Sequence, residues 1–149
     1  MNLRMLVLTI VLAISPNLVS NAQEYPSDLL GVWQAISIER AGEQAPPEAV
    51  KLMRMTFKKD ELLVRGNFQD EREVSCKYKI DAETKPVQFD FTPPGQKNAV
   101  LGILRIESGK LEICMRNGNS SKERPEAFEA TKDDSIVLMR FERTKSPTK

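Results

Sequence analysis

Residues 31–40 of the chain read GVWQAISIER, and this stretch decides the fold. The chain's single tryptophan stands in it two residues after a glycine, at the start of the first strand that the sequence predicts. Aromatic side chains dominate the burial of apolar surface in protein cores. We therefore expect Trp33 to serve the structure of the domain rather than to contact a ligand.

Stretches of the same kind recur along the chain. Apolar and polar residues alternate with a period of two, and turn signals return about every ten residues, as in an antiparallel sandwich or barrel. Short connections favour a closed up-and-down barrel, because sandwiches usually need Greek-key connections. The predicted strands are residues 31–40, 51–58, 61–68, 74–81, 86–91, 99–107, 111–115 and 135–143, with a ninth, short strand at 126–131. Proline suits the first position of a helix, so Pro46 to Ala49 predict a short helical turn in the first connection.

The predicted strand AVLGILRIE, at 99–107, is apolar on both faces. This pattern suggests a strand that is covered on its outer side or bent at Gly102. Arg105 points either inward, as a buried cation that needs a partner, or outward, with its stem along apolar surface. The outward orientation is favoured, because arginine usually packs its apolar stem along the surface and keeps its charged group in water.

The two cysteines lie on opposite faces of the predicted sheet. Cys76 shares a face with Val74 and Tyr78, whereas Cys114 lies on the face opposite to that of Ile113. A disulfide needs side chains that point together. We therefore do not expect the two cysteines to pair, although export would permit it.

The predicted inward side chains form a core that could also line a pocket. They are Met53, Met55, Phe57, Tyr78, Phe89, Phe91, Ile113, Met115, Met139 and Phe141. An eight-stranded barrel is just wide enough to be filled by side chains or to hold one small ligand, and the absence of small inward residues favours filling. For a pocket, the ligand-binding candidates are Met55, Phe57, Tyr78, Phe89, Arg105, Met115 and Met139. Tyr78 stands out because a buried phenol needs a hydrogen-bond partner, which a ligand could supply.

Several short motifs follow one another in a characteristic order. They are Leu30-Gly31-Val32-Trp33, Ser37-Ile38-Glu39-Arg40 with Gly42, Lys85-Pro86 with Asp90, Gly102-Ile103, Leu111 with Cys114, and Arg124-Pro125 with Phe128. In this order and spacing, over residues 29–143, they resemble a family of short exported lipocalin-like domains that is abundant in planctomycete bacteria and has no assigned function. The chain departs from the family pattern at Leu104, where tyrosine is common, and at Ser108-Gly109, where Gly-Asp is usual.

The resemblance implies a lipocalin-like antiparallel barrel of eight or nine strands. In such barrels the glycine and tryptophan of the first strand, here Gly31 and Trp33, close the floor. An arginine from the last strand often lies over the indole, and Arg140 or Arg143 could supply it through a cation–π contact worth about 0.5–2 kcal/mol. Any ligand contact made by the tyrosine ring of the family is lost at Leu104.

The first 22 residues read as an export signal, with Arg4 at the positive start, an apolar run from Met5 to Ile14, and small residues near Ala22. We therefore predict a signal peptide at 1–22, the barrel domain at 23–143 and a flexible tail at 144–149, in a periplasmic or extracellular protein. Without Arg4 the chain carries 21 basic side chains against 21 acidic ones. This balance predicts neither nucleic acid as a partner nor attraction to an anionic membrane surface, and no membrane insertion is expected after signal removal.

The side chains of common catalytic and metal sites are scarce. The chain has no histidine, which removes the commonest general base and metal ligand. Its seven glycines are dispersed, so no phosphate loop is predicted, and its acidic pairs fall in predicted turns. We expect no enzyme, no cofactor and no metal. Two functions stay open: binding of a small apolar or amphipathic ligand in the barrel, or protein interaction or inhibition through the loops at 41–49, 92–98 and 116–125, with a filled core.

Overall fold

The computed structural model describes the chain in four stretches. They are residues 27–66, 72–116, 123–130 and 135–145. The predicted signal peptide and residues 146–149 of the predicted tail lie outside the described residues. Thr144, which was predicted to belong to the tail, is bound to the sheet, since its N–H donates to Val32 O at 2.9 Å.

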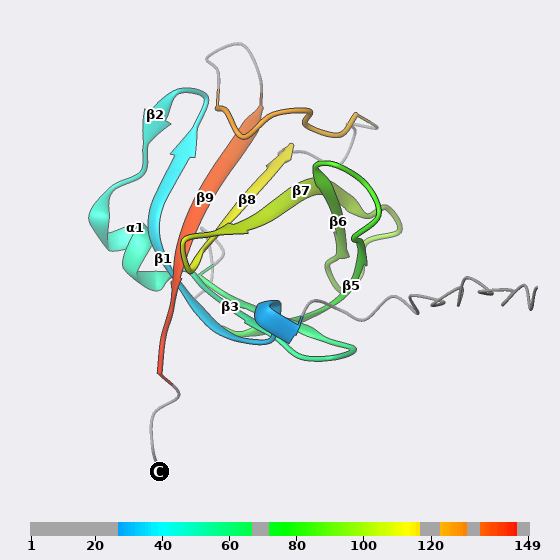
Figure 1. The fold of residues 1–149 in the computed structure, drawn as a ribbon. Helices are drawn as coiled ribbons and strands as arrows, with labels where there is room; N and C mark the ends of the chain where they lie inside the picture. The colour runs from blue at the N-terminus through cyan, green and yellow to red at the C-terminus, as the bar shows by residue number, and fades with distance from the viewer. Residues whose placement is uncertain (1–26, 67–71, 117–122, 131–134, 146–149) are drawn as a thin grey trace, which may run out of the picture.

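The described chain forms the predicted closed antiparallel barrel (Figure 1). Its wall consists of β1 (Gly31–Arg40), β3 (Arg54–Phe57), β4 (Leu62–Arg65), β5 (Val74–Asp81), β6 (Val87–Thr92), β7 (Val100–Glu107), β8 (Lys110–Arg116) and β9 (Ile136–Arg143). Each strand pairs with the next, and β9 pairs with β1 to close the sheet. A two-residue strand, β2 (Glu43–Gln44), pairs with β1 alone. The predicted all-β up-and-down barrel is thereby confirmed.

A short helix, α1 (Pro47–Leu52), occupies the first connection, where a helical turn was predicted. The amide nitrogen of Gln34 on β1 donates to carbonyls at the helix C-terminus, at 3.1 Å to Lys51 O and 2.9 Å to Met53 O. These bonds satisfy carbonyls that a helix end leaves without partners. The predicted start of the next strand, at residue 51, is therefore wrong: the helix continues to Leu52, and β3 begins at Arg54.

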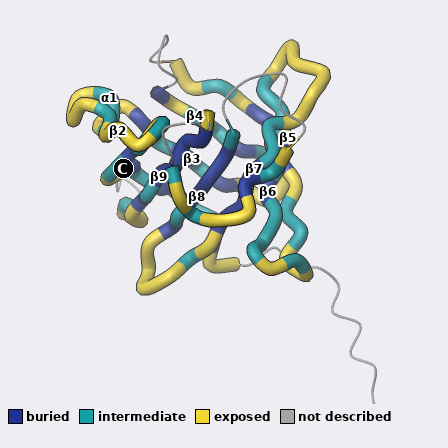
Figure 2. Tube along the Cα trace, turned by 90° about the horizontal axis from the view of Figure 1, so that it is seen from above, coloured by how far each residue is buried: buried dark blue, intermediate teal, exposed yellow. Residues whose placement is uncertain are grey.

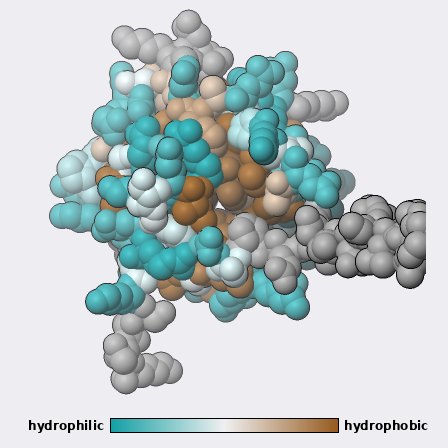
Figure 3. Space-filling model, viewed as in Figure 1, coloured by the Kyte–Doolittle hydropathy of each residue, from teal (hydrophilic) through white to brown (hydrophobic). Residues whose placement is uncertain are grey.

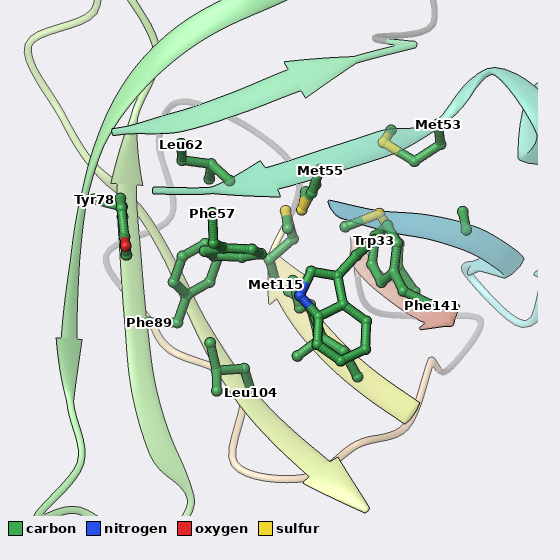
Figure 4. Close-up of a cluster of buried hydrophobic side chains, with 14 of the residues drawn as sticks. Trp33, Met53, Met55, Phe57, Leu62, Tyr78, Phe89, Leu104, Met115 and Phe141 are labelled. Atoms are coloured by element: carbon green, nitrogen blue, oxygen red, sulfur yellow. The ribbon is translucent and has the colours of Figure 1, made fainter. Parts of the chain in front are cut away.

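The inward side chains fill the barrel with one apolar cluster. All ten predicted inward residues belong to this cluster or pack against it, and Figure 4 shows those that it labels pointing toward one another. The ring of Phe57 lies 5.5 Å from that of Tyr78 and 5.9 Å from that of Phe89, between centroids. In Figure 2 burial is concentrated in the strands, and exposure in their connections. The predicted core is confirmed.

A second, smaller cluster lies on the outer face of the barrel. It joins Ile103 of β7, Cys114 of β8 and residues of β9 to Phe128, so β7 is apolar on both faces because residues 123–130 cover its outer side. The predicted short strand at 126–131 is wrong for its described residues, which are irregular. Since β8 and β9 pair directly with each other, they offer this segment no free edge.

Arg124 fastens the covering segment to the wall. Its Nη1 donates to Asp90 Oδ1 of β6 at 2.5 Å and to Gly102 O of β7 at 2.6 Å. Asp90 points outward from β6 and is the ion-pair partner of Arg124.

The floor of the barrel is built around Trp33. Its Nε1 donates to Leu29 O, 2.8 Å away, in the 3₁₀ turn η1 (Ser27–Leu29). The Arg143 guanidinium lies 4.3 Å from the centroid of the indole and binds Leu30 O at 2.6 Å. Gly31 has a φ of 124°, and a Cβ there would lie 2.6 Å from Arg143 Nη1. Trp33 is thus held between Leu29 and the Arg143 guanidinium, which also lies against Gly31.

Candidate functional site

The end of the barrel opposite Trp33 is the candidate site. Because β1 starts at the floor and neighbouring strands are antiparallel, β4 and β6 end at the far end of the barrel, whereas β5 and β7 begin there. We call this far end the open end. Trp33, Arg143 and η1 lie at the floor, so we place the candidate site at the end without these contacts.

Four inward apolar side chains at the open end are only partly buried. Val64, Val74, Phe91 and Val100 come from the neighbouring strands β4 to β7, and each packs against the main core cluster. All four stand at or next to the end of their strand. Together they form an apolar rim. Figure 3 looks at the opposite side of the barrel, where η1 stands in the foreground of Figure 1, and shows that apolar side chains near the middle of that floor side are also surrounded by polar ones.

Deeper in the barrel, most of the predicted binding residues are packing residues. Phe89 is 0% exposed, Met55 and Phe57 are 1% exposed, and Met139 is 3% exposed. Tyr78 and Met115, at 7% and 8%, retain slightly more contact with solvent. The hydroxyl of Tyr78 donates to Lys58 O, so this phenol has a partner in the chain.

Arg105 is not in the interior. It is exposed on the outer face, where it binds Glu112 and lies 4.3 Å from the centroid of the Phe128 ring. The inward alternative is therefore wrong, because the neighbours of Arg105 that face the core are Leu104 and Ile106. Burial opposes ionisation of Glu112, but its hydrogen bonds with Arg140, at 2.7 Å, and Arg105 outweigh this effect and lower its pKa.

The chemistry of the described interior is apolar. Within the described stretches, no polar or charged residue is fully buried. A charge brought into such surroundings without a partner loses its hydration. The interior can therefore accept an uncharged apolar group, and a charged group would have to stay outside.

A groove of about 960 Å³ lies on the outer wall beside the covering segment. Its lining includes Lys85, Pro86, Ile103, Arg116, Arg124 and Glu126. Two of its arginines already have carboxylate partners, since Arg124 binds Asp90 at 2.5 Å and Arg116 lies 3.8 Å from Glu123. The groove thus combines apolar side chains with three basic and three acidic ones. Neither alternation nor any motif predicted it, because it depends on where an irregular segment crosses the sheet.

Both cysteines are free, and they lie on opposite faces as predicted. Burial raises the pKa of the Cys76 thiol, and it raises that of Cys114 to about 11. The thiolate is the reactive form, and a raised pKa keeps it scarce at pH 8. We expect iodoacetamide at pH 8 to label both thiols on the order of 100-fold more slowly in the native protein than in urea. Rapid native labelling, read by mass spectrometry, would contradict this burial.

Over the described stretches, no group of three histidine, cysteine, aspartate or glutamate side chains could hold a metal ion. No helix in the same stretches is long and apolar enough to cross a membrane. Comparisons with family models, curated proteins and solved structures gave no match. The family resemblance therefore stays a prediction, and the geometry of the barrel carries the functional argument.

None of the four rim residues was among the predicted binding candidates, although Val74 was placed on the same face as Tyr78. Phe91 was predicted to point inward but was not among the binding candidates. A usable signal was present: an inward residue at the strand end far from Trp33 must lie near the open end. The prediction instead favoured large side chains such as Phe57 and Phe89, which the barrel uses as core.

Proposed function

We propose that the protein is a non-enzymatic binding protein that takes a small apolar molecule, or the apolar part of an amphipathic one, at the open end of the barrel. The observation that carries this proposal is the apolar rim of Val64, Val74, Phe91 and Val100. Covering such surface removes it from water, which stabilises a complex by about 25 cal/mol per Å².

The filled lower core limits how deep the ligand can enter. Phe57 and Phe89 are at most 1% exposed, and together with Trp33 at the floor they fill the lower part of the barrel. The ligand would therefore rest on the rim and reach toward Met115, leaving its polar end in solvent. Absence of histidine from the chain supports a binding role over catalysis.

The first experiment is native mass spectrometry of the protein from its own source, with an organic extract of the same sample. A stoichiometric added mass that also appears in the extract would support the proposal and identify the class of ligand. A bare protein mass without an extractable compound would count against it.

Substitutions at the rim test the location of binding. We expect Val100→Asn to weaken binding of the uncharged probe N-phenyl-1-naphthylamine about tenfold or more, the equivalent of about 1.4 kcal/mol. Leu101→Asn is the matched control, because Leu101 is the next residue of β7, is also partly buried and faces outward. Fluorescence titration measures both, and equal losses in the two variants would contradict binding at the rim.

The outer groove supports a second candidate, protein interaction. Its volume of about 960 Å³ and its lining by residues 123–127 agree with a partner held at this covering segment. One substitution distinguishes the two functions. Arg124→Gln removes the contacts with Asp90 and Gly102, so it should weaken the binding of a protein partner and leave the binding of a ligand at the rim unchanged.

A further inference from the structure

Two arginines face each other on the outer wall. Arg54 begins β3 and Arg65 ends β4, and the register places them directly opposite one another. Their neighbours Met55 and Val64 face the core, so both arginines point outward. The Cβ atoms of such opposed residues lie about 4.5–5.5 Å apart, and like charges in this position repel.

Neither arginine has a partner among the described residues. The ion pairs and side-chain hydrogen bonds of this part of the chain include neither Arg54 nor Arg65. Moreover, the Nε of Arg54 is buried and has no acceptor. Four other described arginines have carboxylate partners: Arg105 and Arg140 with Glu112, Arg116 with Glu123, and Arg124 with Asp90. The Arg54 and Arg65 pair is therefore an exception.

The surroundings add positive charge. Lys51 lies in the last turn of α1, and its carbonyl accepts from Gln34, which stands opposite Arg54 on β1. The same end of α1 touches Gly66, the residue after Arg65. Among the described acidic residues of the adjoining segments, Glu48 in α1 and Glu73 before β5 form no ion pair with either arginine.

From these observations we infer that Arg54 and Arg65 form a binding site for a phosphate group. A guanidinium presents several N–H donors in a planar fork that matches the oxygens of such an anion. One phosphate between the two side chains would neutralise their repulsion and offer an acceptor to the buried Nε of Arg54. The site is separate from the apolar rim and does not depend on the function proposed for it.

Thermal unfolding tests this site with inorganic phosphate against sodium chloride of equal ionic strength. At ten times the Kd, phosphate should raise the Tm of the wild-type protein by about 4 °C, and the rise should saturate. Arg65→Gln and Arg54→Gln should abolish the rise, whereas Arg105→Gln, on the same outer wall but ion-paired, should keep it. A rise of equal size in all four proteins, or none in the wild type, would overturn the inference.

The behaviour without phosphate separates binding from a structural role. Arg65→Gln removes one of two opposed charges, so in low-salt buffer this variant should be at least as stable as the wild type. A clear loss of stability there would mean that Arg65 already has a partner within the chain, against the inference. Because Arg65 is exposed, this variant stays informative even where Arg54→Gln fails to fold.

Vesicles distinguish the source of the phosphate group. Co-sedimentation with phosphatidylglycerol but not phosphatidylcholine vesicles, lost in Arg65→Gln, would support the site and assign it to a lipid headgroup. Saturable stabilisation by inorganic phosphate without vesicle binding would support the site and assign it to a soluble anion.

Discussion

Replacement of Trp33 by alanine is expected to lower the free energy of unfolding by about 3–5 kcal/mol, the range for removal of a large aromatic side chain from a core. Trp33 is only 1% exposed. The substitution removes its packing, its hydrogen bond to Leu29 O and the surface on which the Arg143 guanidinium stacks. The floor of the barrel would lose the contact that holds η1 in place.

Urea denaturation followed by far-ultraviolet circular dichroism measures this loss, because the variant has no tryptophan to report by fluorescence. Ile36→Ala is the matched control on the same strand, since Ile36 is 38% exposed and should cost little. A Trp33→Ala variant as stable as this control would refute the structural role of Trp33. If a folded Trp33→Phe variant still binds the apolar probe as the wild-type protein does, the binding site at the open end does not depend on the floor.

Local patterns were sufficient to predict the wall and the core. Strand alternation identified which residues face inward, as with Met55, Phe57 and Phe89, because side chains of a strand alternate between the two faces. The glycine and tryptophan of β1 indicated the floor. The helix boundary was missed because residues 51–58 fit a strand pattern, whereas Gln34, distant in sequence, binds the carbonyls that end α1.

The candidate site was harder to predict because it depends on positions along the barrel axis. Alternation places Val100 and Leu104 on the same face of their strand, but it does not say that Val100 is partly exposed and Leu104 is buried. That difference follows from strand register, which only the pairing of neighbouring strands defines. The opposition of Arg54 and Arg65 depends on register in the same way. The outer groove depends on contacts such as that between Arg124 and Asp90, which lie 34 residues apart.

Replacement of Gly66 by alanine is expected to cost about 2–5 kcal/mol in the free energy of unfolding, through a left-handed backbone and an overpacked contact. Gly66 has a φ of 88°, and a Cβ there would overlap the carbonyl group of Leu52 and lie 2.7 Å from Met53 N. These are backbone atoms at the end of α1, so they cannot rotate away as a side chain would. Either β4 or the end of α1 would have to move.

Gly95→Ala and Gly109→Ala are the controls for this variant, because both glycines have a positive φ, at 78° and 73°, with no atom within 4 Å of an added Cβ. They should show the backbone cost alone, about 1–2 kcal/mol. Urea denaturation by tryptophan fluorescence compares all three variants. If Gly66→Ala costs no more than its controls, α1 does not press on the end of β4. If it costs more, the excess measures how firmly α1 is held beside the open end, next to the strand that carries Val64 and Arg65.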